Sequence, residues 1–85
     1  MNISFTPGAW EDYQHWVTQH PPTAKRIVLL LKDVSRSPTD GIGTPKALRH
    51  SLQGMWSRRI TAEHRLVYSV EGETVIIHSC RYHYS

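Results

Sequence analysis

The chain has 85 residues, enough for one domain spanning 1–85 with a small hydrophobic core. Its single cysteine excludes an internal disulfide, and the apolar run at 27–31 is far too short to cross a bilayer. The net charge of +3 comes from the second half of the chain. Residues 1–45 hold four basic and four acidic side chains, whereas residues 46–85 hold six basic and three acidic ones. We therefore expect a cytoplasmic protein without a secretory leader or membrane contact. The basic second half predicts either an anionic partner or a plain solvated surface.

The first 38 residues predict a strand and two helices. Residues 2–5 are a short strand candidate, and Thr6-Pro7 is typical of a helix cap followed by a helix-starting proline. An apolar stripe at helical spacing comes next and indicates core packing: Trp10, Tyr13, Trp16 and Val17. Pro21-Pro22 is expected to end this helix, and Thr23 to cap a second one that ends at 35–38. The second helix has a regular apolar face: Ile27, Leu30, Leu31 and Val34.

The second half predicts a loop and then three strands. The segment "SPTDGIGTPKALRHSLQG" is rich in turn formers and predicts a loop with at most a short strand near 47–52. After it the apolar period changes to two in "MWSRRI", "HRLVYSV" and "TVIIHSCRY". The short links "TAE" and "EGE" make these strands antiparallel neighbours. We expect an α+β fold, in which an N-terminal strand and two helices pack on a mostly antiparallel sheet whose other face stays open.

The open face of the sheet is expected to carry two arginines. Alternate apolar positions predict the core side of two strands: Trp56, Ile60, Leu66, Tyr68 and Val70. Arg59 and Arg65 then point the other way, together with Ser57. Two guanidinium groups on one surface suit the binding of a phosphate.

These arginines and the last residues of the sequence form a candidate set for cutting RNA without a metal. The 2′-hydroxyl of RNA can attack its own phosphate, provided that charge is stabilised and the leaving oxygen is protonated. Arg59 and Arg65 suit the charge, His83 the proton transfer, and Tyr84 the orientation of the phosphate. A plain RNA-binding module with a basic, aromatic-rich surface is the alternative.

The other reactive side chains predict no further chemistry. The six histidines are scattered without metal-binding spacing, so we expect no metal and no cofactor. Cys80 lies inside a strand pattern and is expected to be a small buried residue. His64 and His78 are expected to be structural rather than catalytic.

Two long segments, "LQGMWSRRITAEHRLVYSV" and "CRYHY", closely resemble the YoeB/Txe family of RelE-type bacterial toxins. The similarity extends to the "W..Y..W" pattern of the first helix and to the "DGIGTPKAL" loop, and so covers essentially the whole chain. The resemblance implies a fold like that of RelE and the microbial ribonucleases. It also implies the toxin of a YefM–YoeB type II toxin–antitoxin system.

The resemblance further implies an activity and its partners. Such toxins enter the ribosomal A site and cut the mRNA there without a metal, leaving a 2′,3′-cyclic phosphate and a 5′-hydroxyl. A YefM-type antitoxin silences them with an acidic segment that displaces the toxin's last residues. Operator DNA is bound only through the antitoxin complex, and a homodimer is expected.

Individual roles are implied by the same resemblance. Arg65 matches the arginine that stabilises the phosphate in the transition state, and Arg59 matches an accessory phosphate-binding arginine. His83 matches the general acid, and Tyr84 the tyrosine that helps to orient the substrate. Arg49 replaces a lysine and keeps its charge.

Lys46 departs from the family, because relatives have at this position a glutamate that is regarded as the general base. Four explanations stand: neighbouring arginines keep Lys46 uncharged so that it can accept a proton, Lys46 acts only through its charge, the toxin is weakened, or Lys46 merely points to solvent. We favour the second. The alternative function is an attenuated family member that binds antitoxin or ribosome as a regulator. Arg58 is assigned a contact with the backbone of ribosomal RNA.

Overall fold

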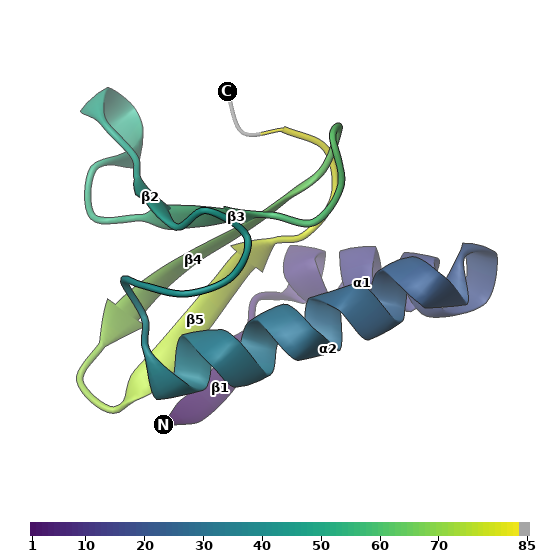
Figure 1. The fold of residues 1–85 in the computed structure, drawn as a ribbon, viewed down its shortest axis with the longest axis horizontal. Helices are drawn as coiled ribbons and strands as arrows, with labels where there is room; N and C mark the ends of the chain where they lie inside the picture. The colour runs from purple at the N-terminus through teal and green to yellow at the C-terminus, as the bar shows by residue number, and fades with distance from the viewer. Residues whose placement is uncertain (84–85) are drawn as a thin grey trace.

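The computed structural model of this chain describes residues 1–83. Within this range five strands form one sheet, in the order β1-β5-β4-β3-β2 (Figure 1). β1 pairs with β5 in parallel and all other neighbours are antiparallel. The strands are β1 (Asn2–Phe5), β2 (Lys46–Ala47), β3 (Trp56–Arg59), β4 (Arg65–Glu71) and β5 (Thr74–Ser79).

Two helices cover one face of the sheet, α1 (Pro7–Gln19) and α2 (Pro21–Arg36) (Figure 1). The predicted α+β arrangement is therefore confirmed. No helix in residues 1–83 is long and apolar enough to cross a membrane.

The helix starts follow the local sequence, with one correction. The Thr6 side chain caps α1 as predicted, because its hydroxyl accepts a hydrogen bond from the N–H of Ala9 at 3.1 Å. The expectation that Thr23 caps α2 is wrong, since α2 already begins at Pro21 and its cap residue is His20. Proline suits the first turn of a helix because its missing N–H would have no partner there. Thr23 is instead buried inside α2, with its hydroxyl 2.8 Å from Nδ1 of His20.

The core lies between the helices and the sheet, and α2 contributes its whole predicted face: Ile27, Leu30, Leu31 and Val34. The predicted stripe of α1 is only partly buried. Trp16 is in the core and Tyr13 packs against it, but Trp10 and Val17 are each 48% exposed. Val70, expected in the core, is 38% exposed near the end of β4. Helical spacing identified the right helix but overstated the width of its buried face.

The loop between α2 and β3 contains two short elements. The strand expected near 47–52 is displaced, because β2 covers only Lys46–Ala47 and a 3-10 turn, η1 (His50–Leu52), follows it. Positive φ angles at Gly41 (128°) and Gly43 (81°) let the chain turn sharply before β2.

A buried arginine holds this loop to the rest of the domain. The side chain of Arg58 is 0% exposed and donates to Oδ2 of Asp33 at 2.6 Å and to the Tyr68 hydroxyl at 3.1 Å. Its remaining hydrogen bonds go to three loop carbonyls: Ser37 at 2.6 Å, Asp40 at 3.0 Å and Ile42 at 3.2 Å. In the described residues no buried polar side-chain atom lacks a partner. We call Arg58 with Asp33 and Tyr68 the arginine cluster.

Asp33 completes the arginine cluster from α2. Its carboxylate accepts a hydrogen bond from the N–H of Ile42 at 2.9 Å, in addition to that from Arg58. These two hydrogen bonds, the first more than the second, hold the pKa of Asp33 below its usual value of 3.8. α2, the loop and β3 are thus joined through one ion pair.

Replacing Arg58 should strongly destabilise the fold. In Arg58→Met the three loop carbonyls and Asp33 lose their donor, so we expect the free energy of unfolding to fall by about 3–5 kcal/mol. Arg59→Met, at the exposed neighbouring position of β3, should change it by only about 0.5 kcal/mol. Urea unfolding of both variants measures the difference, and equal stabilities would contradict the role given to Arg58.

Acid should weaken the arginine cluster. Because folding lowers the pKa of Asp33, its contribution to stability is present above the usual value of 3.8 and is lost as the pH falls through the folded value. The unfolding free energy measured between about pH 2 and pH 5 should therefore fall less steeply in Asp33→Asn than in the natural protein. Glu71→Gln removes an exposed carboxylate at the end of β4 and serves as the control. An unchanged slope in Asp33→Asn would refute this account.

Candidate active site

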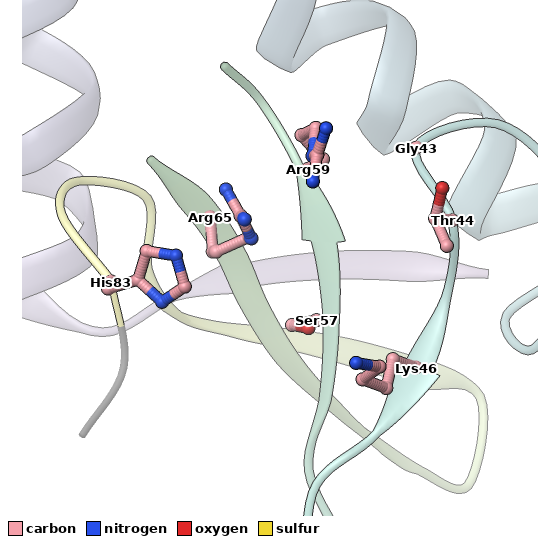
Figure 2. A pocket seen from close by; sticks show the side chains of 7 residues that line it. All are labelled: Gly43, Thr44, Lys46, Ser57, Arg59, Arg65 and His83. Carbon is pink, nitrogen blue, oxygen red and sulfur yellow. The ribbon is translucent and has the colours of Figure 1, made fainter. Parts of the chain in front are cut away.

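A pocket of about 140 Å³ lies on the sheet face that is turned away from the helices (Figure 2). We call it the basic pocket. Its lining comes from the loop before β2, from β2, β3 and β4, and from the segment after β5: Gly43, Thr44, Lys46, Ser57, Arg59, Arg65 and His83. Three of these side chains are cationic, and among the described residues no carboxylate lines the pocket.

The strand register explains how the charges meet. Arg59 and Arg65 are direct partners across β3 and β4, and Lys46 is the partner of Ser57 across β2 and β3. Figure 2 shows Lys46 and His83 on opposite sides of the pocket, with both arginines along one edge. Like charges placed directly opposite destabilise a sheet, and a bound anion would relieve the repulsion.

Arg65 is held in place by the turn that precedes it. Its Nη1 donates to the carbonyl of Thr61 at 2.8 Å, to that of Ala62 at 3.3 Å and to that of His64 at 3.1 Å. The guanidinium is therefore oriented before any ligand arrives, which lowers the entropic cost of binding a phosphate.

The loop wall of the basic pocket is built closely against β3. The N–H of Arg59 donates to the carbonyl of Gly43 at 2.7 Å. A Cβ on Gly43 would lie 2.8 Å from Cδ2 of Leu30 and 3.2 Å from the carbonyl oxygen of Arg59. Only glycine lets the loop approach both the core and the strand at this distance.

The segment after β5 brings His83 to the pocket, and it is anchored at Cys80. The Cys80 N–H donates to Oδ2 of Asp12 at 3.1 Å, and its carbonyl accepts from Nε1 of Trp16 at 2.8 Å. The thiol is buried as predicted, and desolvation raises its pKa to about 12, so it is no nucleophile. Two residues later the N–H of Arg65 donates to the carbonyl of Tyr82 at 3.0 Å. His83 thus follows a residue bonded to β4.

In the described part of the chain, no three His, Cys, Asp or Glu side chains lie close enough together to hold a metal ion.

Comparison with known proteins decides the family. The family described as "YoeB-like toxin of bacterial type II toxin-antitoxin system" matches residues 5–84. The chain belongs to the YoeB family of bacterial toxins. Toxin YoeB of Escherichia coli K12 is 45% identical over 84 residues, covering 99% of this chain and 100% of that protein.

Solved YoeB structures share the whole fold. The YoeB dimer from Staphylococcus aureus is 45% identical with a TM-score of 0.92, covering 99% of this chain and 98% of that one. A heterotetrameric YoeB–YefM complex from the same organism is 45% identical with a TM-score of 0.91 and the same coverage. The fold that the resemblance implied is therefore confirmed.

The structure brings together four of the residues that the YoeB resemblance singled out: Lys46, Arg59, Arg65 and His83. Tyr84 lies outside the described residues. Arg49 is exposed at the start of η1 and does not line the basic pocket.

The assignment of Arg58 to an RNA contact has to be corrected. The side chain is completely buried on the helix side of the sheet, and it is bonded to Asp33, Tyr68 and loop carbonyls. It cannot reach RNA without breaking the arginine cluster. Its role in this YoeB chain is to position the loop that carries Lys46.

Three pocket residues were not singled out from the sequence. Ser57 was placed on the open face by strand alternation, but its small side chain suggested no role. Gly43 and Thr44 lie in the turn-rich loop, where only the glycine pattern indicated a special backbone.

Gly43→Ala should disturb this YoeB chain more than a matched glycine substitution. Gly72 also has a positive φ, of 60°, but a Cβ there would meet nothing within 4 Å. Both variants place a Cβ at a positive φ, and only Gly43→Ala adds a close contact with Leu30 and β3. We expect Gly43→Ala to lower the unfolding free energy by about 1–2 kcal/mol more than Gly72→Ala. Thermal unfolding tests this. Equal losses of unfolding free energy in the two variants would show that the loop moves away from Leu30 and β3 at little cost.

Proposed function

We propose that this protein is a ribosome-dependent mRNA endonuclease, a toxin that inhibits translation by cutting mRNA in the ribosomal A site. The observation that carries the proposal is the basic pocket, where Lys46, Arg59, Arg65 and His83 meet on an open sheet face. Membership of the YoeB family of toxins supports it.

The pocket suits the chemistry of intramolecular RNA cleavage. The 2′-oxygen loses its proton and bonds to phosphorus, while the bond to the 5′-oxygen breaks. This leaves a 2′,3′-cyclic phosphate and a 5′-hydroxyl. Arg65 and Arg59 bind the phosphate and stabilise its added negative charge. His83 donates a proton to the departing 5′-oxygen. Tyr84 follows it in the chain and is proposed to orient the substrate.

Lys46 contributes charge rather than a base. It lies on the side of the pocket opposite His83, where relatives are expected to carry a glutamate (Figure 2). Its ammonium group stabilises the phosphate together with the arginines. With no carboxylate among the described lining residues, the proton of the 2′-hydroxyl passes to a phosphate oxygen or to water. Arg49, exposed beside β2, contacts the RNA backbone.

The partners of the toxin follow from its relatives. A YoeB from Staphylococcus aureus has been solved as a dimer and in a complex with YefM. We propose a homodimer and a YefM-type antitoxin whose acidic segment covers the basic pocket. Operator DNA is bound only through that complex, and the toxin acts in the bacterial cytoplasm.

The second candidate is an attenuated toxin that binds the antitoxin or the ribosome as a regulator. One observation favours it: position 46 of the pocket is a lysine, where relatives are expected to carry a glutamate that acts as the base. Both candidates predict anion binding in the basic pocket, so only a cleavage assay separates them.

His83→Ala should greatly slow the cleavage of mRNA on the ribosome. Purified ribosomes are programmed with a defined mRNA, and the 5′ ends of the fragments are mapped for the natural protein, His83→Ala and Lys46→Glu. Loss of the general acid should lower the cleavage rate on the order of 10²- to 10⁴-fold. His78→Ala removes a histidine that does not line the pocket and is bonded to Ser69, and it serves as the matched control.

The Lys46→Glu variant separates the two candidates. Cleavage by the natural protein that is lost only in His83→Ala establishes an active toxin that works without the glutamate. Cleavage that appears only in Lys46→Glu establishes the attenuated regulator and refutes the endonuclease.

A further inference from the structure

Of the four pocket residues given a role in cleavage, Lys46, Arg59 and Arg65 lie in strands, whereas His83 lies in the segment after β5. It follows the end of β5 by four residues, and the chain reaches it through a sharp change of direction at Tyr82. Tyr82 has a φ of 62°, in the left-handed region. This conformation costs a non-glycine residue about 1–2 kcal/mol, so it persists only where neighbouring groups hold it.

The backbone of Tyr82 makes two hydrogen bonds, one with a backbone group and one with a side chain. The Tyr82 carbonyl accepts from the N–H of Arg65 at 3.0 Å. The Tyr82 N–H donates to Nδ1 of His64 at 2.6 Å. A backbone N–H can only donate, so Nδ1 accepts and the imidazole is neutral, with its proton on Nε2.

The ring of His64 is itself well supported. Its edge contact with the indole of Trp16 has a centroid distance of 4.7 Å and an interplanar angle of 76°. The backbone carbonyl of His64 accepts from the N–H of Ile60 at 3.0 Å, which closes the turn between β3 and β4. Trp16 also holds Cys80, so one aromatic side chain from α1 supports the segment at two points.

We infer that His64 is the positioning residue that places His83 in the basic pocket. It does not line the pocket, and it acts by holding the N–H of the residue before His83. Its importance for catalysis rests on the proposed function, in which His83 is the general acid. A displacement of a proton donor by about 1 Å can lower a rate on the order of 10²-fold.

The test compares His64→Leu, which removes the acceptor, with His64→Asn, whose Oδ1 can take the place of Nδ1. His78→Leu is the matched control, since His78 Nε2 is hydrogen-bonded to Ser69 and lies outside the pocket.

The first readout needs no ribosome. In the natural ¹⁵N-labelled protein, a two-bond nitrogen–nitrogen coupling should connect the Tyr82 amide with Nδ1 of His64. Exchange of the Tyr82 amide hydrogen should become on the order of tenfold faster in His64→Leu, and change little in His64→Asn and His78→Leu.

The second readout is cleavage of ribosome-bound mRNA. His64→Leu should lower kcat on the order of 10- to 100-fold with little change in KM, because the phosphate-binding side chains stay in place. His64→Asn should recover most of this loss, which a merely structural histidine would not explain. An absent coupling, an unprotected Tyr82 amide, or equal kcat losses in His64→Asn and His64→Leu would overturn the inference. Intact coupling and the expected exchange pattern in a protein without cleavage would refute the endonuclease and still support the placement of His83 by His64.

Discussion

The fold depends on one buried charge, the guanidinium group of Arg58. Arg58 is fully buried, and a buried guanidinium is tolerated only when all its donors are used. Asp33 from α2, Tyr68 from β4 and three loop carbonyls use them. The same contacts that satisfy Arg58 also decide where the loop before β2 runs. One buried group thus sets the distance between the helices, the sheet and the loop wall of the pocket.

The basic pocket is the opposite kind of arrangement, because its described lining has three cationic side chains and no carboxylate. Arg59 and Arg65 face each other across two strands, with Lys46 close by and no acidic side chain among the described lining residues. This costs stability in the empty protein, and the well-packed core on the other face of the sheet offsets that cost. A surplus of positive charge among the described lining residues is what a phosphate-binding surface requires. The hydrophobic core and this surplus of charge thus lie on opposite faces of the same strands.

Much of this arrangement could be predicted from periodicity. The alternation of β3 and β4 placed Arg59 and Arg65 on the open face, and the apolar repeat of α2 identified its buried side. Arg58 was instead assigned an RNA contact, because a fully buried arginine is rare and needs partners distant in sequence. Asp33 and the loop carbonyls are 16 to 25 residues away from it, and no local pattern connects them. The sequence did place His83 with the two arginines, but it gave no sign of the contact that holds the preceding residue, a hydrogen bond between Tyr82 and His64, 18 residues apart.

The sheet order also has a consequence for folding during synthesis. β5 follows every other strand in the sequence, yet it lies between β1 and β4. β1 therefore has no partner until some seventy further residues have been made, as its pairing of Asn2 with Thr74 shows. During synthesis from the N-terminus the sheet cannot close, and the segment carrying His83 follows later still. The basic pocket can therefore form only after residues 1–83 have all been synthesised, although Lys46, Arg59 and Arg65 are made well before His83.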